Sequence, residues 1–167
     1  LLVQESSVIH GNREALIGKA LEWGATHILF MDDDMVFPPA AVGSLFGRRH
    51  DIVITNYPKR GFPLSPTAVR IDGGAMETVG RRGIEEAYYG GFGLALFSAE
   101  VFRKTPKPWF LPRWDEAAQS YTTEDLPFYE RAREQGFRVW VDHDASKMIG
   151  HHGSWPFQWP EENADGG

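Results

Sequence analysis

Short apolar runs alternate with amphipathic stretches along the first third of the chain, and this alternation predicts an α/β fold. Apolar residues recur at helical spacing after Asn12, and a nearly continuous apolar run ends at Met31. Such a run is typical of a strand buried on both faces of a sheet. Helix and strand in repeated order favour right-handed crossovers and a parallel sheet. The elements predicted here are helices over 12–23 and 38–46 and strands over 26–31 and 51–55.

The rest of the chain has a looser pattern. Residues 56–93 are rich in Pro and Gly, which indicates an elaborated sheet edge with short strands around 68–71 and 77–79. A strand over 94–97, a helix over 99–104, an aromatic loop over 106–114, a helix over 124–135 and a strand over 137–141 follow. We therefore expect one domain over residues 1–153 and an irregular aromatic and acidic tail over 154–167.

Composition narrows the class of protein. The 167 residues suit a single domain, and 17 basic against 23 acidic residues give a net charge of −6, so no nucleic-acid partner is expected. The chain has no cysteine, which excludes disulfides and thiolate metal sites. No apolar run reaches the roughly 18 residues of a membrane span, and no signal peptide opens the chain, so we expect a cytoplasmic protein.

Three consecutive carboxylates end the first predicted strand. Asp32 and Asp34 leave the same face if the chain stays extended, and Asp33 points the other way. Mutual repulsion favours a bound divalent cation, and oxygen ligands without thiolate suit Mg²⁺ or Mn²⁺. A solvated acidic loop is the alternative, although ligands of open α/β sheets bind at the carboxyl ends of strands.

Two later motifs could join this site. His151 and His152 lie between glycines after the last predicted strand, and a neutral imidazole can complete a metal shell that carboxylates begin. Glu124 and Asp125 begin a helix, where acids are stabilised by the helix dipole without any function. A carboxylate there becomes a general base only if it faces an acceptor hydroxyl.

Glycines and aromatic residues mark two further candidate segments. Gly91-Phe92-Gly93 could let a ligand approach the backbone or could simply form a turn. Trp109 and Trp114 lie in a Pro-rich loop, where flat rings could hold sugars or pack beneath the loop.

Together these motifs resemble an inverting glycosyltransferase of the GT-A fold, similar to the small family-two-like enzymes of phages and bacteria. The resemblance covers about residues 8–153 and implies a Rossmann-like, mostly parallel sheet flanked by helices. Its matching pieces are Asn12-Arg13, the strand ending in Asp32-Asp33-Asp34, Pro38-Pro39, Gly91-Phe92-Gly93, Thr123-Glu124-Asp125, and Val139-Trp140-Val141-Asp142 leading to Gly150-His151.

The resemblance implies a role for each candidate residue. Asp34 would hold the cation, Mn²⁺ or Mg²⁺, with Asp32 and His151 as further ligands. Asp125 would deprotonate the acceptor, oriented by Glu124. The remaining implied contacts are Asp32, Asp33, Arg13 and Arg60 with the nucleotide-diphosphate sugar, and Gly91, Phe92, Gly93, Trp109 and Trp114 with a glycan or other hydroxyl acceptor.

Members of this family normally begin with a strand and a helix that hold the nucleobase. Those elements would precede Leu1, so the resemblance implies an N-terminally truncated version, whose missing elements a partner chain could supply.

Two other functions fit parts of the sequence. The chain could be a non-catalytic module that keeps the sugar and nucleotide site of such an enzyme. It could also be a haloacid-dehalogenase-like phosphatase, with Asp32 and Asp34 as nucleophile and acid, which would require a later lysine at an adjoining strand end.

Overall fold

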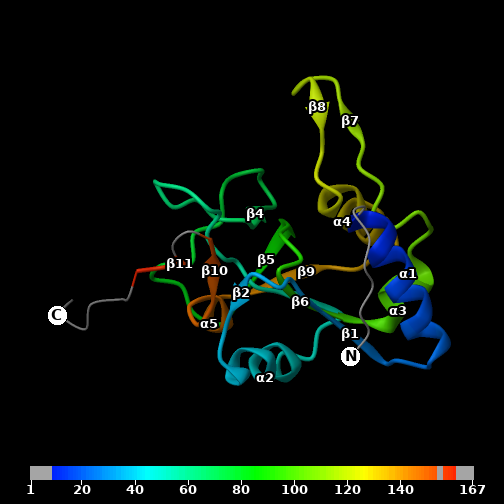
Figure 1. Cartoon of the computed structure of the whole chain (residues 1–167), viewed down its shortest axis with the longest axis horizontal. Helices are drawn as coiled ribbons and strands as arrows, with labels where there is room; N and C mark the ends of the chain where they lie inside the picture. The colour runs from blue at the N-terminus through cyan, green and yellow to red at the C-terminus, as the bar shows by residue number, and fades with distance from the viewer. Residues whose placement is uncertain (1–8, 154–155, 161–167) are drawn as a thin grey trace.

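A six-stranded sheet between two layers of helices forms the body of the molecule (Figure 1). The computed structural model describes residues 9–153 and 156–160. The helices are α1 (Ile9–Glu22), α2 (Pro39–Gly47), α3 (Ala99–Lys104), α4 (Asp125–Glu134) and α5 (His143–Ser146). The sheet strands, in spatial order, are β1 (His27–Met31), β6 (Leu94–Ser98), β3 (Ile52–Ile54), β9 (Val139–Asp142), β5 (Ile84–Tyr89) and β4 (Val69–Arg70).

The sheet is mixed, so the prediction of a mostly parallel sheet is wrong, while the α/β class is confirmed. Within the described part of this sheet, only β3 and β9 pair in parallel, and the other four pairings are antiparallel. The cause is β6, which lies between the first two predicted strands and pairs antiparallel with both. Four consecutive buried residues let β6 occupy this central position, as the apolar run 94–97 predicts.

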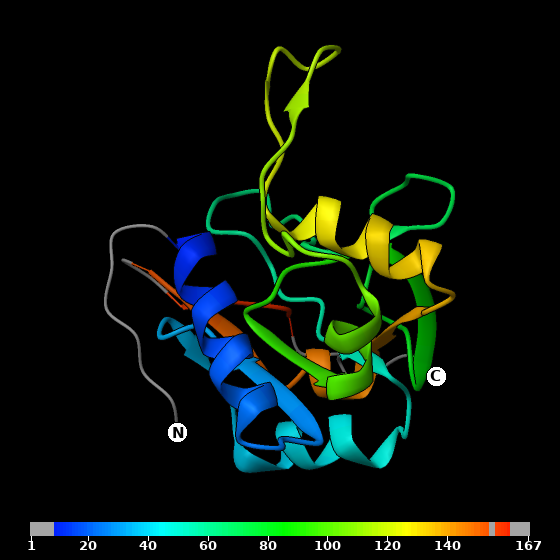
Figure 2. The same cartoon turned by 90° about the vertical axis from the view of Figure 1, so that its right-hand side faces the viewer.

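Each face of the sheet is covered by its own set of helices. Helices α1, α3 and α4 pack on one face, where buried aromatic rings dominate, including Phe97, Phe102 and Phe128. Helices α2 and α5 pack on the other face through smaller side chains such as Leu45 and Ala145. The two helical layers lie on opposite sides of the sheet in Figure 2.

Strand β1 lies at the edge of this sheet within the described part of the chain. Its end residues are exposed and its central residues half-buried, although its apolar run predicts burial on both faces. Sequence alone cannot distinguish an edge from a central position here, because both faces of β1 still pack partly against side chains of the two cores.

Two smaller sheets extend the body. Strands β2 (Met35–Val36), β10 (Gly150–His152) and β11 (Pro156–Gln158) form one, so part of the tail expected to be irregular is ordered. The rest of that tail, residues 154–155 and 161–167, lies outside the described residues. Strands β7 (Trp114–Asp115) and β8 (Ser120–Tyr121) form a hairpin that projects from the body above α4 (Figures 1 and 2).

The expected strand at 77–79 does not form, and β5 occurs instead. Strand β5 contains Glu85 and Glu86, which hide its strand pattern in the sequence. Both carboxylates have partners from distant segments: Glu85 contacts His143, and Glu86 contacts Arg133 and Arg138. Glu85 also pairs with Arg81, so that ion pairs at both glutamates, together with the contact to His143, make a charged strand compatible with an interior position in the sheet.

Candidate functional site

Pairing between β2 and β10 brings the acidic triplet to the histidine motif. His151 is opposite Met35 in the register of these strands, and the amide of His152 donates to the carbonyl oxygen of Asp34 at 2.7 Å. As a result, the Nε2 atom of His151 lies 3.4 Å from Oδ2 of Asp34. The structure therefore joins two of the three residues predicted to hold a cation.

The surroundings of Asp34 leave capacity for a cation. Its Oδ2 contacts the guanidinium of Arg60, whereas its buried Oδ1 and the buried Nδ1 of His151 have no hydrogen-bond partner among the residues that the structure describes. Within the described residues, no group of three His, Asp or Glu side chains has metal-binding geometry. One carboxylate and one imidazole still fit Mg²⁺ or Mn²⁺, because such cations commonly take few protein ligands and complete their shell with substrate phosphates and water.

Asp32, the third predicted ligand, has a different partner. The chain does not stay extended after β1, because the amide of Met35 closes a turn onto the carbonyl oxygen of Asp32 at 3.2 Å. The turn separates the carboxylates of Asp32 and Asp34, so that Asp32 meets Arg13 instead. Asp33, predicted to contact the donor, is exposed at the tip of this turn.

Arg13 on α1 connects Asp32 to the start of α4. Its Nη2 donates to Oδ1 of Asp32 at 3.1 Å, and its Nη1 donates to Oε1 of Glu124 at 2.7 Å. The same Nη1 lies 3.4 Å from Oδ1 of Asp125. Three of the predicted site residues therefore share one guanidinium, which was expected to bind the diphosphate of the donor.

Asp125 is the first residue of α4, and its carboxyl group faces inward with 17% of the side chain exposed. Burial raises the pKa of Asp125 to about 8, and the neighbouring charges of Glu124 and Asp32 add to the rise, while Arg13 opposes it. A carboxyl group with a pKa near neutrality is suited to accept and release a proton during a reaction.

Asp125 and His151 line the same cavity, of about 210 Å³. This volume is below the roughly 300–1,000 Å³ typical of sites for drug-sized ligands, so the cavity suits one small group of a larger substrate. The rest of its border is formed by Tyr57, Lys59, Thr67, Tyr89, Gly91 and Thr123.

The glycines around Phe92 make room for a neighbouring tyrosine. A Cβ on Gly91 would lie 2.2 Å from the hydroxyl of Tyr57, and one on Gly93 would lie 2.6 Å from the same ring. Phe92 itself is buried among the core aromatics. Of this motif, only Gly91 borders the cavity, so packing around Tyr57 accounts for the glycines at 91 and 93.

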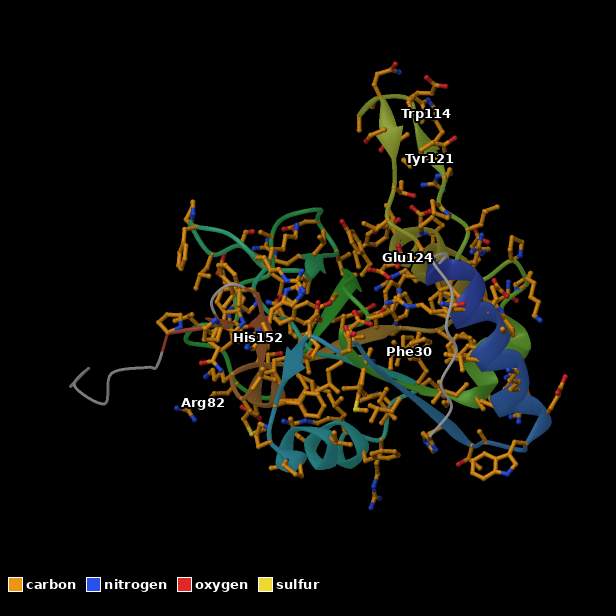
Figure 3. All side chains as sticks on the ribbon, in the orientation of Figure 1. Phe30, Arg82, Trp114, Tyr121, Glu124 and His152 are labelled. Atoms are coloured by element: carbon orange, nitrogen blue, oxygen red, sulfur yellow. The ribbon has the colours of Figure 1, made fainter. Side chains whose placement is uncertain are left out.

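The two tryptophans predicted to bind the acceptor lie in different environments. Trp109 is 3% exposed, and its indole N–H donates to the carbonyl oxygen of Thr105, so it belongs to the core. Trp114 is 43% exposed on the hairpin and packs edge-on against Tyr121, which is 70% exposed. Glu124 lies at the base of this hairpin (Figure 3). Of the two predicted residues, Trp114 is the one that presents a ring to solvent.

Sequence reasoning missed Tyr57, Lys59 and Tyr89 at the cavity. Tyr57 and Lys59 follow β3 closely, and Tyr89 ends β5. The first two could have been found, because strand β3 was predicted and residues beyond the carboxyl ends of strands tend to form sites. Tyr89 had no such signal, since its strand was not predicted.

Lys104 and Lys107 follow the acidic triplet in the sequence and are candidates for the lysine that a haloacid-dehalogenase-like phosphatase requires. Lys104 ends α3, and the ammonium of Lys107 lies 4.4 Å from the ring centroid of Trp109. Neither lysine borders the cavity that contains Asp125.

Comparison with known proteins gives a fold and no family. No protein-family model matches the chain. No curated protein matches it either. Among solved structures, 13 chains match. One is the crystal structure of A197 from STIV, which is 17% identical, has a TM-score of 0.65, and is aligned over 98% of this chain and 82% of its own length.

These findings correct the resemblance to family-two-like GT-A glycosyltransferases. No family model supports it, and the observed sheet is mixed where that resemblance implies a mostly parallel one. At 17% identity, the similarity to A197 from STIV extends to the fold alone. Within the described residues, no helix has both the length and the apolar character needed to cross a membrane.

Proposed function

We propose that the chain transfers a sugar from a nucleotide-diphosphate donor to an acceptor hydroxyl, with inversion and with the help of a divalent cation. The observation that supports this most is the position of Asp125. Its buried carboxyl group, with a pKa raised to about 8, lies in a cavity that is also bordered by His151, the neighbour of Asp34. A general base and a cation site thus border one small cavity, as transfer to a hydroxyl requires.

In this proposal Asp34 and His151 hold the cation, with Arg60 beside them. When bound, the cation would stabilise the negative charge of the departing diphosphate. Arg60 contacts Asp34 and the carbonyl oxygen of His152, and because its side chain is 48% exposed, it can turn from these partners toward phosphate oxygens, which its planar guanidinium suits. The positive charges of Arg60 and the cation would attract the negative diphosphate and so favour it over a neutral leaving group.

Asp125 acts on the acceptor. Its ionised carboxylate takes the proton of the acceptor hydroxyl as the acceptor oxygen forms a bond to the anomeric carbon. The bond from that carbon to the diphosphate oxygen breaks, and the nucleoside diphosphate leaves with the electron pair. A single displacement of this kind inverts the anomeric centre. Trp114 on the projecting hairpin offers an exposed ring face on which a more distant sugar of the acceptor could stack.

Two variants separate binding from turnover. Asp34→Ala should abolish Mn²⁺-dependent binding of a nucleoside diphosphate, measured by titration calorimetry. Asp125→Asn should keep that binding and lose transfer from a panel of nucleotide sugars, followed by nucleoside diphosphate release. Asp72→Asn, in the exposed turn after β4, is the matched control and should retain both.

Each other outcome has a definite meaning. Transfer by Asp125→Asn at the wild-type rate would overturn the role of Asp125. If the wild type binds the nucleoside diphosphate with Mn²⁺ and transfers sugar from no donor, the proposed enzymatic activity is overturned in favour of a non-catalytic binding protein. Release of inorganic phosphate from a simple phosphomonoester would favour a phosphatase.

A further inference from the structure

Arg13 is enclosed on two sides by groups that fix its guanidinium. Its side chain is 12% exposed, and its Cζ lies 5.0 Å from the ring centroid of Phe92 and 5.9 Å from that of Phe30. Aromatic contacts at these distances hold a guanidinium in place by cation–π attraction. Its Nη atoms are directed at carboxylates: Asp32 from the end of β1, and Glu124 and Asp125 from the start of α4.

This arrangement makes Arg13 a poor binding group for a diphosphate. Both Nη atoms of Arg13 already contact carboxylates. A phosphate would have to displace these carboxylates in a region where three acidic side chains surround one guanidinium. Like charges close together oppose the ionised form of each carboxyl group, and a guanidinium within hydrogen-bond distance favours it. Removing Arg13 would leave Glu124, Asp125 and Asp32 to repel one another.

We infer that Arg13 is a positioning residue for the general base: it fixes the carboxyl groups of Glu124 and Asp125 and ties them to Asp32 at the end of β1. This inference rests on the proposed function and gives Arg13 a role on the acceptor side of the site, in place of the donor contact predicted from the sequence. Arg13 thus positions the general base Asp125 from α1, an element that contributes no residue to the border of the cavity.

Several charged or titratable groups surround Asp125, and each affects its proton equilibrium. Glu124 and Asp32 oppose its ionisation and Arg13 favours it. The hydroxyls of Tyr57, Tyr89 and Tyr129 interact with its charge, which contributes to the raised pKa of each tyrosine. Lys59 and His151 border the same cavity. Of the groups whose influence on the pKa of Asp125 is resolved, Arg13 is the cation that lowers it.

The test compares Arg13→Gln and Arg13→Lys with the wild type in the pH dependence of transfer. Arg13→Gln should move the rising limb of the profile to higher pH by about one unit, an approximately tenfold loss of rate on that limb. The KM for the donor should change by less than about twofold, since uniform binding is not affected. Arg13→Lys keeps the charge without the planar guanidinium, so the rising limb of its profile should lie between those of the wild type and Arg13→Gln.

Arg103→Gln is the matched control, because Arg103 forms an exposed ion pair with Glu100 on α3 and should leave the profile unchanged. An unshifted profile in Arg13→Gln, together with a KM for the donor raised about tenfold, would overturn the inference and assign Arg13 to the diphosphate.

A second measurement does not depend on activity. Carbon-13 NMR of the Asp125 carboxyl group should show a higher pKa in Arg13→Gln than in the wild type, and Arg13→Lys provides the comparison if the glutamine variant does not fold. If the wild-type protein transfers no sugar and Arg13→Gln still raises the pKa of Asp125, the proposed function is refuted and the positioning role of Arg13 is retained. An Asp125 pKa that is the same in the wild type and in a folded variant would overturn the positioning role itself.

Discussion

Replacing Gly91 with alanine should destabilise the protein, because the added methyl group has no room. The new Cβ would lie 2.2 Å from the hydroxyl of Tyr57 and 3.0 Å from Cζ of its ring. Tyr57 is buried, contacts the ring of His151 edge-on, and accepts a hydrogen bond from the amide of Gly93, so movement of its ring would lose these contacts. Overpacking of this kind costs about 1–3 kcal/mol. We expect Gly91→Ala to lower the free energy of unfolding by about 2 kcal/mol, measured by urea denaturation.

Two further variants make this prediction specific. Gly43 is exposed within α2 and a Cβ there meets nothing within 4 Å, so Gly43→Ala should stabilise the protein by about 0.5–1 kcal/mol. Tyr57→Phe removes the atom nearest to the added methyl group, so Gly91→Ala should cost less in that background than in the wild type. Equal urea midpoints for Gly91→Ala and the wild type, or equal costs in both backgrounds, would refute the packing role of Gly91.

Two predictions concern buried charge away from the cavity. Asp142 is fully buried, and its carboxylate accepts hydrogen bonds from Ser44, Arg48 and the amides of Asp144 and Ala145. Asp142→Ala should therefore lower the free energy of unfolding by about 3–5 kcal/mol, whereas Asp72→Ala, at an exposed position, should change it by less than about 0.5 kcal/mol. A loss below 1 kcal/mol, about the size of a single surface ion pair, would contradict this. Burial lowers the pKa of His143, so its native form resists protonation and its contribution to stability is lost as pH falls below its ordinary value of 6.5. The stability difference between the wild type and His143→Gln should therefore be larger at about pH 7.5 than at about pH 5, and a difference independent of pH would contradict a buried neutral imidazole.

Local patterns in the sequence predicted most elements and the class of fold, but not the order of strands. The apolar run 94–97 identified β6 as a buried strand, yet its insertion between β1 and β3 depends on pairing between distant segments. Strand β5 was missed because the sequence does not show that Glu86 pairs with Arg133 and that Glu85 contacts both Arg81 and the distant His143. Periodicity records which side chains are apolar, and it does not record which charges will be paired after folding.

The same limit applies to the site. Asp34 and His151 were predicted together, and the pairing of β2 with β10 places them side by side. Arg13 was expected at the diphosphate, because the sequence could not show that α1 brings it between Asp32 and the start of α4. For Trp109 the sequence left open an acceptor contact or packing beneath its loop, and the structure shows the second, because the loop folds back into the aromatic core. Residue type and spacing predicted which groups carry chemistry, and only the fold shows which groups they contact.

The pH dependence of nucleoside diphosphate release tests the proposed role of Asp125 most directly. With Mn²⁺, a nucleotide sugar and an acceptor, the rate for the wild-type protein should rise with pH through a midpoint of about 8, as the carboxyl group of Asp125 becomes ionised. Asp125→Asn should lose both the rate and this limb while its urea midpoint stays close to that of the wild type. A folded Asp125→Asn protein that releases nucleoside diphosphate at the wild-type rate, with the same pH profile, would contradict the assignment of Asp125 as the general base.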